Sequence, residues 1–333
     1  MTTCSLSTRN LLLTSFLAVS LVCSANAADK NKAWTDSAVA AAEDPDFLIQ
    51  GEYGSLEQGA AYAAQVVALG DGKFDAYFLE GGLPGLGWTR EKSRTHVGGE
   101  LIDGKVEFKG KELHAVLANG RITGSFGPVT LDLPKVERKS PTLGMAPPEG
   151  AIVLFDGTSA EGWKKGKIVD GLLAATGTTS EKTFADCTIH LEFLTPYKPH
   201  ARGQGRGNSG VYYGGRWETQ VLDSFGLEGK MNETGGIYSI AAPSLNMCFP
   251  PLTWQTYDVD LTWAKFDENG ERKSWPRITV KLNGVVVHED QELNKTHTTA
   301  APVKGEFDEK GGPIFLQNHG NPVFYRNIWV LPR

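Results

Sequence analysis

The sequence predicts an all-β protein built from many short strands. Glycine occurs 39 times and proline 17 times in the 333 residues, and both residues mark turns between short segments. Beyond residue 27, the long apolar pattern of period 3.6 that a helix requires is missing, whereas several segments alternate apolar and polar residues as half-buried strands do. Strands of this length and number predict a β-sandwich or a β-barrel.

The first 27 residues have the layout of a secretory signal peptide. Arg9 precedes an apolar run at 11–22, and residues 25–27 read Ala-Asn-Ala, which places cleavage before residue 28. The run is too short to span a membrane, so we expect no stable membrane insertion after signal removal. Lipidation of Cys23 is the alternative, but the residues before it lack the small side chain expected there. We therefore expect a secreted or periplasmic protein.

Charge and cysteine content exclude some classes of function. The formal net charge is −6, and no cluster of basic residues interleaved with aromatics is found, so nucleic acid is not an expected partner. Only Cys187 and Cys248 remain after signal cleavage. They could form a disulfide or stay as buried thiols on separate strands, and their spacing leaves both readings open. No cysteine spacing typical of zinc occurs.

We expect two domains joined by a linker. Residues 45–133 contain several strand patterns, including a hairpin around Gly70-Asp71-Gly72, and are predicted to form a small β accessory domain without assigned chemistry. Residues 134–148 are rich in proline and mixed in charge, which is typical of an extended linker. Residues 149–333 form the second predicted domain. The alanine-rich segment 37–43 is expected to be a helical turn or a mobile leader.

The second domain has the clearer strand signals. Alternating patterns predict antiparallel strands at 186–194 and 254–263. Residues 277–288 predict a hairpin, because Asn283-Gly284 at its centre suits a two-residue turn with positive φ. Two more strands are expected at 313–319 and 323–330.

A polar motif within the second domain suggests a site. Glu218 and Gln220 are two residues apart on a predicted strand, so both side chains project from one face. A carboxylate and an amide on one face suit the hydroxyl groups of a sugar, although an ordinary exposed sheet face would show the same pattern. Asn208 and Ser209 are adjacent and face opposite ways, and we expect Asn208 to be the one that reaches the site.

The second domain resembles the 3-keto-disaccharide hydrolase family. The resemblance covers residues 149–333 and rests on blocks that occur in the order of the family: Leu154-Phe155-Asp156-Gly157, Gly162-Trp163, Asn208-Ser209-Gly210, residues 218–224, Gly235-Gly236-Ile237-Tyr238, residues 254–258 and residues 312–329. It implies a concanavalin-like jelly roll of two antiparallel sheets, with a concave face that holds sugar. It also implies hydrolysis of glycosides whose sugar carries a ketone at C3.

The implied reaction needs a base near C2, a group that stabilises the C3 oxygen and an acid near the leaving oxygen. His319 is a candidate catalytic residue because it is expected to share a strand face with Gln317, and histidine is a common proton-transfer group in enzymes. Its alternative role is structural, at the Gly320-Asn321 corner. Glu218 is the second catalytic candidate, as base or acid. Gln317 is expected to bind substrate.

Four further residues complete the expected substrate site. Asp223 is either a sugar ligand or a structural acid at a strand end, and it points away from Glu218 unless a bulge re-aims it. Arg326, predicted to share a face with Phe324 and Ile328, could hold the enolate oxygen or pair with Glu218. Trp163 and Lys164 follow a turn, and Trp163 is either a core residue or a platform for a sugar ring.

The sequence leaves alternatives open for both the cofactor and the function. No cofactor is required by the sequence, and although a divalent ion could stabilise an enolate, no ligand spacing identifies one. The leading hypothesis is an exported enzyme that cleaves 3-keto glycosides or 3-keto disaccharides, so that its partner is a small-molecule or oligosaccharide substrate. A non-catalytic carbohydrate-binding sandwich is the first alternative. A conventional glucanase is the second, and the lack of a second carboxylate in phase with Glu218 disfavours it.

Overall fold

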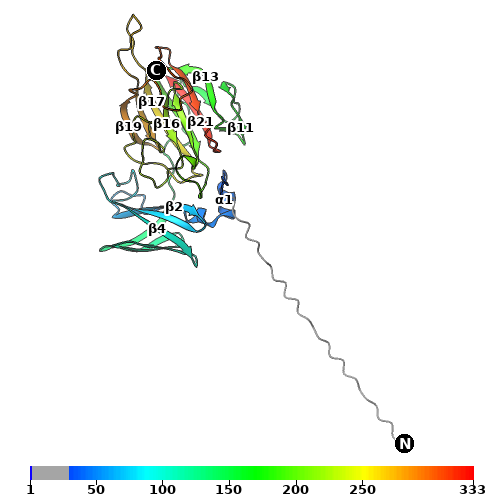
Figure 1. Ribbon diagram of the computed structural model, residues 1–333, viewed down its shortest axis with the longest axis vertical. Helices are drawn as coiled ribbons and strands as arrows, with labels where there is room; N and C mark the ends of the chain where they lie inside the picture. Colours follow the sequence, from blue (N-terminus) through cyan, green and yellow to red (C-terminus); the bar gives the residue numbers. More distant parts are fainter. Residues whose placement is uncertain (2–29) are drawn as a thin grey trace.

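The computed structural model describes Met1 and residues 30–333, which form a small β-barrel followed by a jelly-roll sandwich (Figure 1). The predicted signal peptide falls, apart from Met1, outside the described residues. Two short helices, α1 (Ser37–Glu43) and α2 (Pro45–Ile49), precede the barrel. The Asp36 carboxylate caps α1 by accepting from the N–H groups of Ala38 and Val39. No described helix has the length and apolar character that crossing a bilayer requires.

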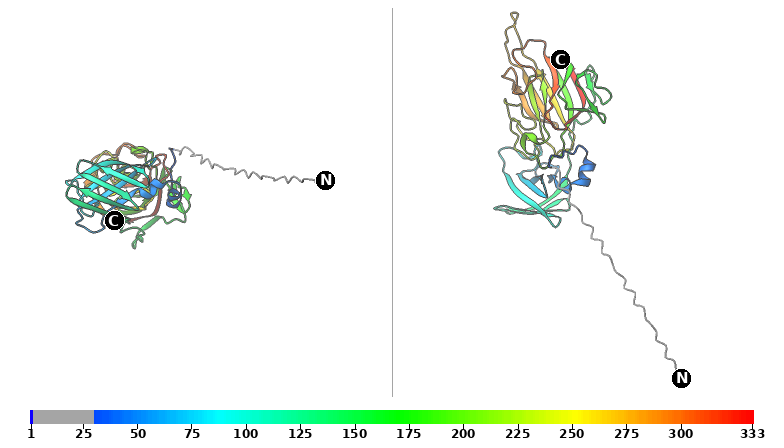
Figure 2. Two further views of the ribbon diagram at one scale, coloured as in Figure 1. Left: turned by 90° about the horizontal axis from the view of Figure 1, so that it is seen from below. Right: turned by 45° about the vertical axis from the view of Figure 1, so that its right-hand side comes forward.

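The barrel closes because its first strand pairs with both its second and its last. Register pairs such as Glu52 with Val136 join the two ends of the sheet, so the barrel leaves no open strand edge. Figure 2 shows this barrel from below. The strands in order are β1 (Gly51–Tyr53), β2 (Tyr62–Gly70), β3 (Lys73–Glu80), β4 (Arg94–Ile102), β5 (Lys105–Lys109), β6 (Leu113–Ala118), β7 (Arg121–Phe126) and β8 (Val129–Val136).

The second domain consists of two antiparallel sheets. The five-stranded sheet has the order β10 (Trp163–Lys164), β13 (Thr178–Phe184), β20 (Gly312–Leu316), β15 (Ser209–Tyr213), β16 (Trp217–Val221). The larger sheet has the order β11 (Ile168–Val169), β12 (Leu172–Ala174), β21 (Phe324–Pro332), β14 (Cys187–Leu194), β17 (Gln255–Thr262), β18 (Arg277–Leu282), β19 (Val285–Glu292), and β9 (Ile152–Phe155) also pairs with β21. A short 3₁₀ turn spans Gly203–Gly205.

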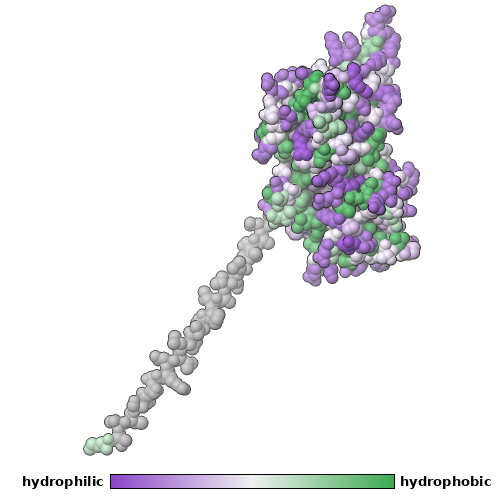
Figure 3. Space-filling view, turned by 180° about the vertical axis from the view of Figure 1, so that it is seen from behind, coloured by the Kyte–Doolittle hydropathy of each residue, from purple (hydrophilic) through white to green (hydrophobic). Residues whose placement is uncertain are grey.

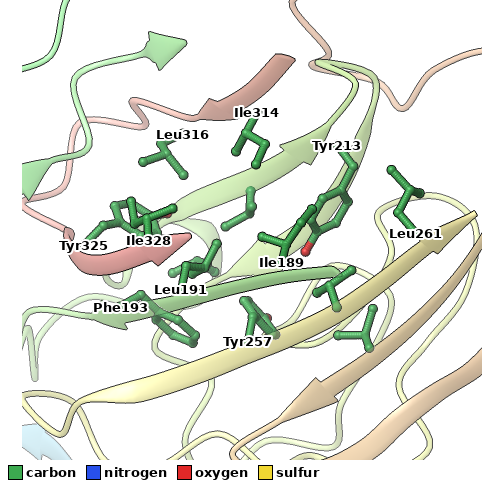
Figure 4. Packing of buried hydrophobic residues seen from close by; sticks show 14 of the residues in the cluster. Ile189, Leu191, Phe193, Tyr213, Tyr257, Leu261, Ile314, Leu316, Tyr325 and Ile328 are labelled. Atoms are coloured by element: carbon green, nitrogen blue, oxygen red, sulfur yellow. The ribbon is translucent and has the colours of Figure 1, made fainter. Parts of the chain in front are cut away.

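The core of the jelly roll lies between these sheets. Figure 4 shows Leu316 and Tyr213 on one side facing Leu191 and Tyr257 on the other. Each of these four side chains is buried, and each comes from the apolar half of an alternating strand. The predicted all-β fold with a jelly-roll domain is confirmed.

One local prediction is confirmed by the structure, and two features that the sequence left open are decided by it. The Asn283-Gly284 hairpin joins β18 to β19, and both of its residues have positive φ, 52° and 81°. Residues 37–43 form the helix α1. Cys187 and Cys248 are both buried and free, so they do not pair with each other.

The barrel and the jelly roll meet in a buried apolar contact. Barrel residues such as Val67 and Trp88 cluster with Phe225 and Cys248 of the jelly roll. Polar contacts surround this cluster: the Arg90 guanidinium donates to three carbonyl oxygens of the jelly roll, those of Gly229, Pro243 and Ser244. In the view of Figure 3, hydrophilic side chains spread over both domains, with smaller apolar areas between them.

Residues 137–150, called the strap below, connect the domains. The stretch expected to be a linker begins at 134, but residues 134–136 continue β8. The strap then lies against the outer face of the larger sheet: the Thr142 hydroxyl donates to Asp258 Oδ2 at 2.7 Å, and the Gly144 N–H donates to Glu192 Oε1 at 2.6 Å. The division of the chain into independent domains remains a prediction.

Candidate active site

The strands β15 and β16 present a polar face on the outside of the five-stranded sheet. Val211 and Tyr213 of β15 point into the core, so strand alternation turns Gly210 and Tyr212 outward. Tyr212 lies directly opposite Glu218 in the register of the two strands. A Cβ atom at position 210 would lie 2.3 Å from Glu218 Oε1. Glycine at 210 therefore leaves the space that the carboxylate occupies.

Glu218 is a buried carboxyl group whose pKa is raised. Only 2% of the residue is exposed, and the Tyr212 hydroxyl donates to Glu218 Oε2 at 2.7 Å. Burial raises the pKa of Glu218 to about 7, while the hydrogen bond from Tyr212 acts in the opposite direction. A carboxyl group with such a pKa exchanges a proton near neutral pH, which is the property of a general base or acid.

Gln317, the residue that follows the neighbouring strand β20, extends this arrangement. Its Nε2 donates to the Tyr212 hydroxyl oxygen at 2.9 Å, which links Gln317, Tyr212 and Glu218 in one chain of hydrogen bonds. Gln317 Oε1 is buried and has no hydrogen-bond partner among the described residues. A buried acceptor without a partner costs stability, and a hydroxyl group of a bound ligand would satisfy it.

An amide cluster lies beside the carboxylate. Gln220 Nε2 donates to Asn208 Oδ1 at 3.3 Å and to Gln204 Oε1 at 3.0 Å. Asn208 Nδ2 donates to Gln204 Oε1 at 2.9 Å. Within the described part of the chain, Gln220 Oε1 is a second buried acceptor without a partner. As expected, Asn208 and not Ser209 belongs to this cluster, because the Ser209 hydroxyl turns into the core and lies 2.8 Å from the Tyr325 hydroxyl.

His319 is exposed in the loop that follows β20. The strand ends at Leu316, earlier than the sequence predicts, so His319 lies beyond the regular strand. Its carbonyl oxygen accepts a hydrogen bond from Asn321 Nδ2 at 3.1 Å, and Asn321 Oδ1 accepts one from Lys198 Nζ at 2.7 Å. Burial lowers the pKa of Lys198. Through Asn321, the loop after β20 thus connects Lys198 with the backbone of His319.

Arg326 is not part of this polar face, and the predicted pairing with Glu218 is wrong. Its Nε donates to Glu192 Oε2 at 2.6 Å on the larger sheet. Arg326 and Glu218 belong to different sheets, and Glu218 projects from the outer face of its own sheet. The shared face expected for Arg326 and Ile328 is also lost at a β-bulge: the register of β21 against β14 shifts here, and Asn327 has a φ of 45°. The bulge turns Arg326 outward and Ile328 into the core, although a regular strand would place the two on one face.

The other expected substrate ligands are held by other partners or lie at the far edge of the sheet. Asp223 is 2% exposed and accepts a hydrogen bond from Arg206 Nε at 2.7 Å. Trp163 is in the core, with its indole N–H donating to the Leu154 carbonyl oxygen at 2.7 Å. Lys164 is exposed on β10, at the opposite edge of the sheet from β16. The structure thus brings together Glu218 and three amide residues, Asn208, Gln220 and Gln317.

Three residues of this region had no role in the prediction. Tyr212 could have been found, because it is two residues from Gly210 and in phase with the Glu218 face. Gln204 and Lys198 belong to the irregular segment before β15, where no periodicity fixes the direction of a side chain. Among the described residues, no group of three or more His, Cys, Asp or Glu side chains is arranged to hold a metal ion.

Three solved structures from Parabacteroides distasonis ATCC 8503, each described as a "putative glycosyl hydrolase", are similar to this chain. The first is 32% identical with a TM-score of 0.49, and the match covers 56% of this chain and 84% of that chain. The second is 21% identical with a TM-score of 0.41 and coverages of 56% and 94%. The third is 20% identical with a TM-score of 0.41 and coverages of 55% and 99%. No curated protein matches the chain.

A family model matches the chain over residues 150–331, and the family is described as the 3-keto-alpha-glucoside-1,2-lyase-like domain. This match indicates a glycosyl hydrolase-like function with a carbohydrate substrate. Because this match spans more than half of the chain, the protein belongs to the 3-keto-alpha-glucoside-1,2-lyase-like family.

Proposed function

We propose that the protein is an exported enzyme that cleaves 3-keto glycosides, with Glu218 as the base that removes the proton from C2. The observation that carries the proposal is the buried carboxyl group of Glu218, whose pKa is raised to about 7. A ketone at C3 acidifies the C2–H bond of the sugar. A base of moderate strength is therefore sufficient for the first step.

The proposed reaction proceeds by elimination and hydration. The C2–H bond breaks, its proton moves to Glu218, and its electron pair forms the enolate of the C3 ketone. The enolate then re-forms the ketone and expels the oxygen on C1, leaving a C1=C2 double bond, and the departing oxygen takes up a proton. Water adds across the double bond, so the overall result is hydrolysis of the glycosidic bond.

The remaining polar groups have proposed roles in binding. Gln317 Oε1 and Gln220 Oε1 are acceptors without partners in the described structure, and sugar hydroxyl groups would donate to them. Asn208 holds Gln220 in place. We propose that His319, exposed in the loop after β20, protonates the leaving oxygen, because an imidazole side chain can act as a general acid.

A conventional glucanase mechanism receives less support from this site. It requires two carboxyl groups that flank the scissile bond. The nearest carboxylate in the sequence, Asp223, is occupied by Arg206 in a buried ion pair. The reaction by elimination needs only one carboxylate, and Glu218 provides it.

The proposal is tested by comparing a 3-keto disaccharide with its unoxidised parent. Release of monosaccharide from each is followed by chromatography with wild-type protein and with Glu218→Gln. We expect cleavage of the 3-keto compound alone, and its loss in the variant. Equal rates on both sugars would overturn the elimination mechanism. Binding of both sugars without cleavage of either would favour a carbohydrate-binding domain instead.

A further inference from the structure

A cavity lies between the barrel and the jelly roll, away from the Glu218 face. Its volume is about 510 Å³, within the range of about 300–1,000 Å³ that is typical of small-molecule sites. Gln50 at the end of α2, Lys135 of β8 and Arg138 of the strap contribute to its wall. Pro251 and Trp254 contribute from the loop before β17 of the larger sheet. Glu218 belongs to the other sheet, so this cavity is a separate site.

Gln50, which lines this cavity, carries a buried hydrogen-bond donor without a partner among the described residues. The residue is 3% exposed. Its Oε1 accepts from the Ala68 N–H at 3.0 Å and from Arg206 Nη2 at 3.4 Å. Both partners can only donate, which fixes the orientation of the amide. Its Nε2 is therefore a true donor, and it has no acceptor among the described residues. An oxygen atom of a ligand in the cavity would supply one.

Trp254 offers a flat apolar surface on the opposite wall. The Arg326 guanidinium carbon lies 3.9 Å from the centroid of its ring, so this contact occupies one face and holds the indole in place. Pro250 and Pro251 line the cavity beside the ring. A rigid aromatic ring next to proline rings is a surface on which the C–H face of a pyranose packs well.

The charges of the wall favour a neutral ligand. The Arg138 guanidinium donates two hydrogen bonds of 2.6 Å to the Glu52 carboxylate, so these two charges compensate each other. Lys135 Nζ donates to the Leu48 carbonyl oxygen at 2.6 Å. Glu52, Lys135 and Arg138 therefore have partners, and the other two charged residues of the wall, Glu137 and Lys139, are exposed to solvent. Among the described lining residues, the buried side-chain group without a partner is the neutral amide of Gln50.

From these observations we propose a second carbohydrate-binding site in the interdomain cavity, which takes one or two pyranose units of a neutral glycan. One sugar ring stacks on Trp254, and a sugar oxygen accepts the hydrogen bond from Gln50 Nε2. The site goes beyond the proposed cleavage reaction, because it requires no ketone on the sugar and no contact with Glu218. Such a site would hold a glycan to the protein outside the active site.

The test measures binding of unoxidised cellotriose, maltotriose and xylotriose to full-length Glu218→Gln protein by calorimetry and tryptophan fluorescence. We expect at least one of these sugars to bind. Trp254→Ala should weaken that binding by about tenfold or more, because it removes the stacking platform. Gln50→Met should weaken it as well, and it serves as an independent arm if Trp254→Ala does not fold. Melting curves establish folding for each variant.

Trp275→Ala is the matched control. Like Trp254, Trp275 makes a cation–π contact, with Arg272 Cζ 3.7 Å from its ring centroid. Trp275 does not line the cavity. Its substitution should leave the affinity unchanged. Cleavage of a 3-keto disaccharide should stay within about twofold when Trp254→Ala is introduced into the otherwise wild-type protein, so failure of this site and failure of the proposed reaction are separable.

Three outcomes would overturn the second site. The first is that none of the three neutral sugars binds at millimolar concentration. The second is that Trp254→Ala and Trp275→Ala have equal effects on binding. The third is that only an acidic sugar such as trigalacturonate binds, which would contradict the assignment of a neutral ligand.

Discussion

The Tyr212 hydroxyl donates a hydrogen bond of 2.7 Å to Glu218 Oε2, and the two residues are direct register partners on adjacent strands. This bond stabilises the charged form of a carboxyl group that burial otherwise keeps neutral. The opposition of the two effects leaves Glu218 with a pKa of about 7. Tyr212 is therefore a positioning residue that tunes the proposed base.

The first prediction concerns Glu218→Gln. The amide keeps the shape of the side chain and can still accept the hydrogen bond from Tyr212, but it cannot take a proton from C2. We expect kcat on a 3-keto glucoside to fall by about 10²-fold or more. The melting temperature at neutral pH should not fall, because a neutral amide replaces a buried acid. A variant that is folded and fully active would exclude Glu218 as the base.

The second prediction concerns pH. If Glu218 acts as a base, kcat/KM should rise with pH and level off above about pH 7, following the carboxyl group of the free enzyme. Initial rates between pH 5 and pH 9 in buffers of constant ionic strength measure this profile. A rate that already reaches its plateau at pH 5 would contradict the assigned role.

The same titration affects folding with a defined sign. The folded-state pKa lies above the usual value of 4.5, so the folded protein retains a proton that the unfolded chain releases. The contribution of Glu218 to the free energy of unfolding is therefore greatest below about pH 4.5 and falls as pH rises toward about 7. The loss is on the order of 3 kcal/mol. Glu218→Gln should flatten this part of the stability profile in denaturant titrations.

The third prediction concerns Tyr212→Phe. Loss of the hydroxyl removes the hydrogen bond that lowers the pKa of Glu218, so the acid limb of the kcat/KM profile should move to higher pH. Tyr213→Phe is the matched control, because Tyr213 is the next residue and points into the core. The control should leave the limb in place. An equal shift in both variants would indicate a general disturbance of β15.

The fourth prediction concerns His319→Ala. The side chain is exposed, so its removal should hardly change the melting temperature. If the imidazole protonates the leaving oxygen, kcat should fall by about 10²-fold, and a substrate with a more acidic leaving group should lose less. His114→Ala, which removes an exposed histidine of the barrel strand β6, should change neither quantity. Lost stability with full specific activity would instead support a structural role for His319.

Patterns that are local in sequence predicted their part of the structure well. The Asn283-Gly284 turn needs positive φ at both residues, and that requirement is encoded in the two residues themselves. The shared face of Glu218 and Gln220 follows from the period of two along one strand. Such features depend on the chain within a few residues, so the sequence alone is sufficient.

Features that depend on distant partners could not be predicted in the same way. The bulge at Asn327 is defined only by the register of β21 against β14, a strand more than 130 residues earlier in the chain. It placed Arg326 and Ile328, which were expected to share a face, on opposite faces of the sheet. Likewise, residues 134–148 were predicted to be an extended linker, and nothing in the sequence indicated that Glu192 and Asp258 bind part of this segment to the sheet. Its contacts depend on where the sheet lies in the fold, and the local amino-acid composition of the strap does not encode that position.

The last prediction concerns Arg326→Ala, which separates the two roles expected for this arginine. Its partner Glu192 is 1% exposed at the side chain and lies under the strap. Although burial raises the pKa of Glu192, hydrogen bonds from His190, Asn327 and Arg326 bring it down to about 2. Removing Arg326 leaves this buried carboxylate with fewer donors, so the free energy of unfolding should fall by about 2 kcal/mol. Because Arg326 lies on the larger sheet, kcat on a 3-keto glucoside should stay within about twofold.

The matched control is Arg277→Ala, which breaks a solvent-exposed ion pair with Asp290 and should change neither stability nor activity appreciably. A large loss of kcat in a variant as stable as the wild type would place Arg326 at the substrate after all.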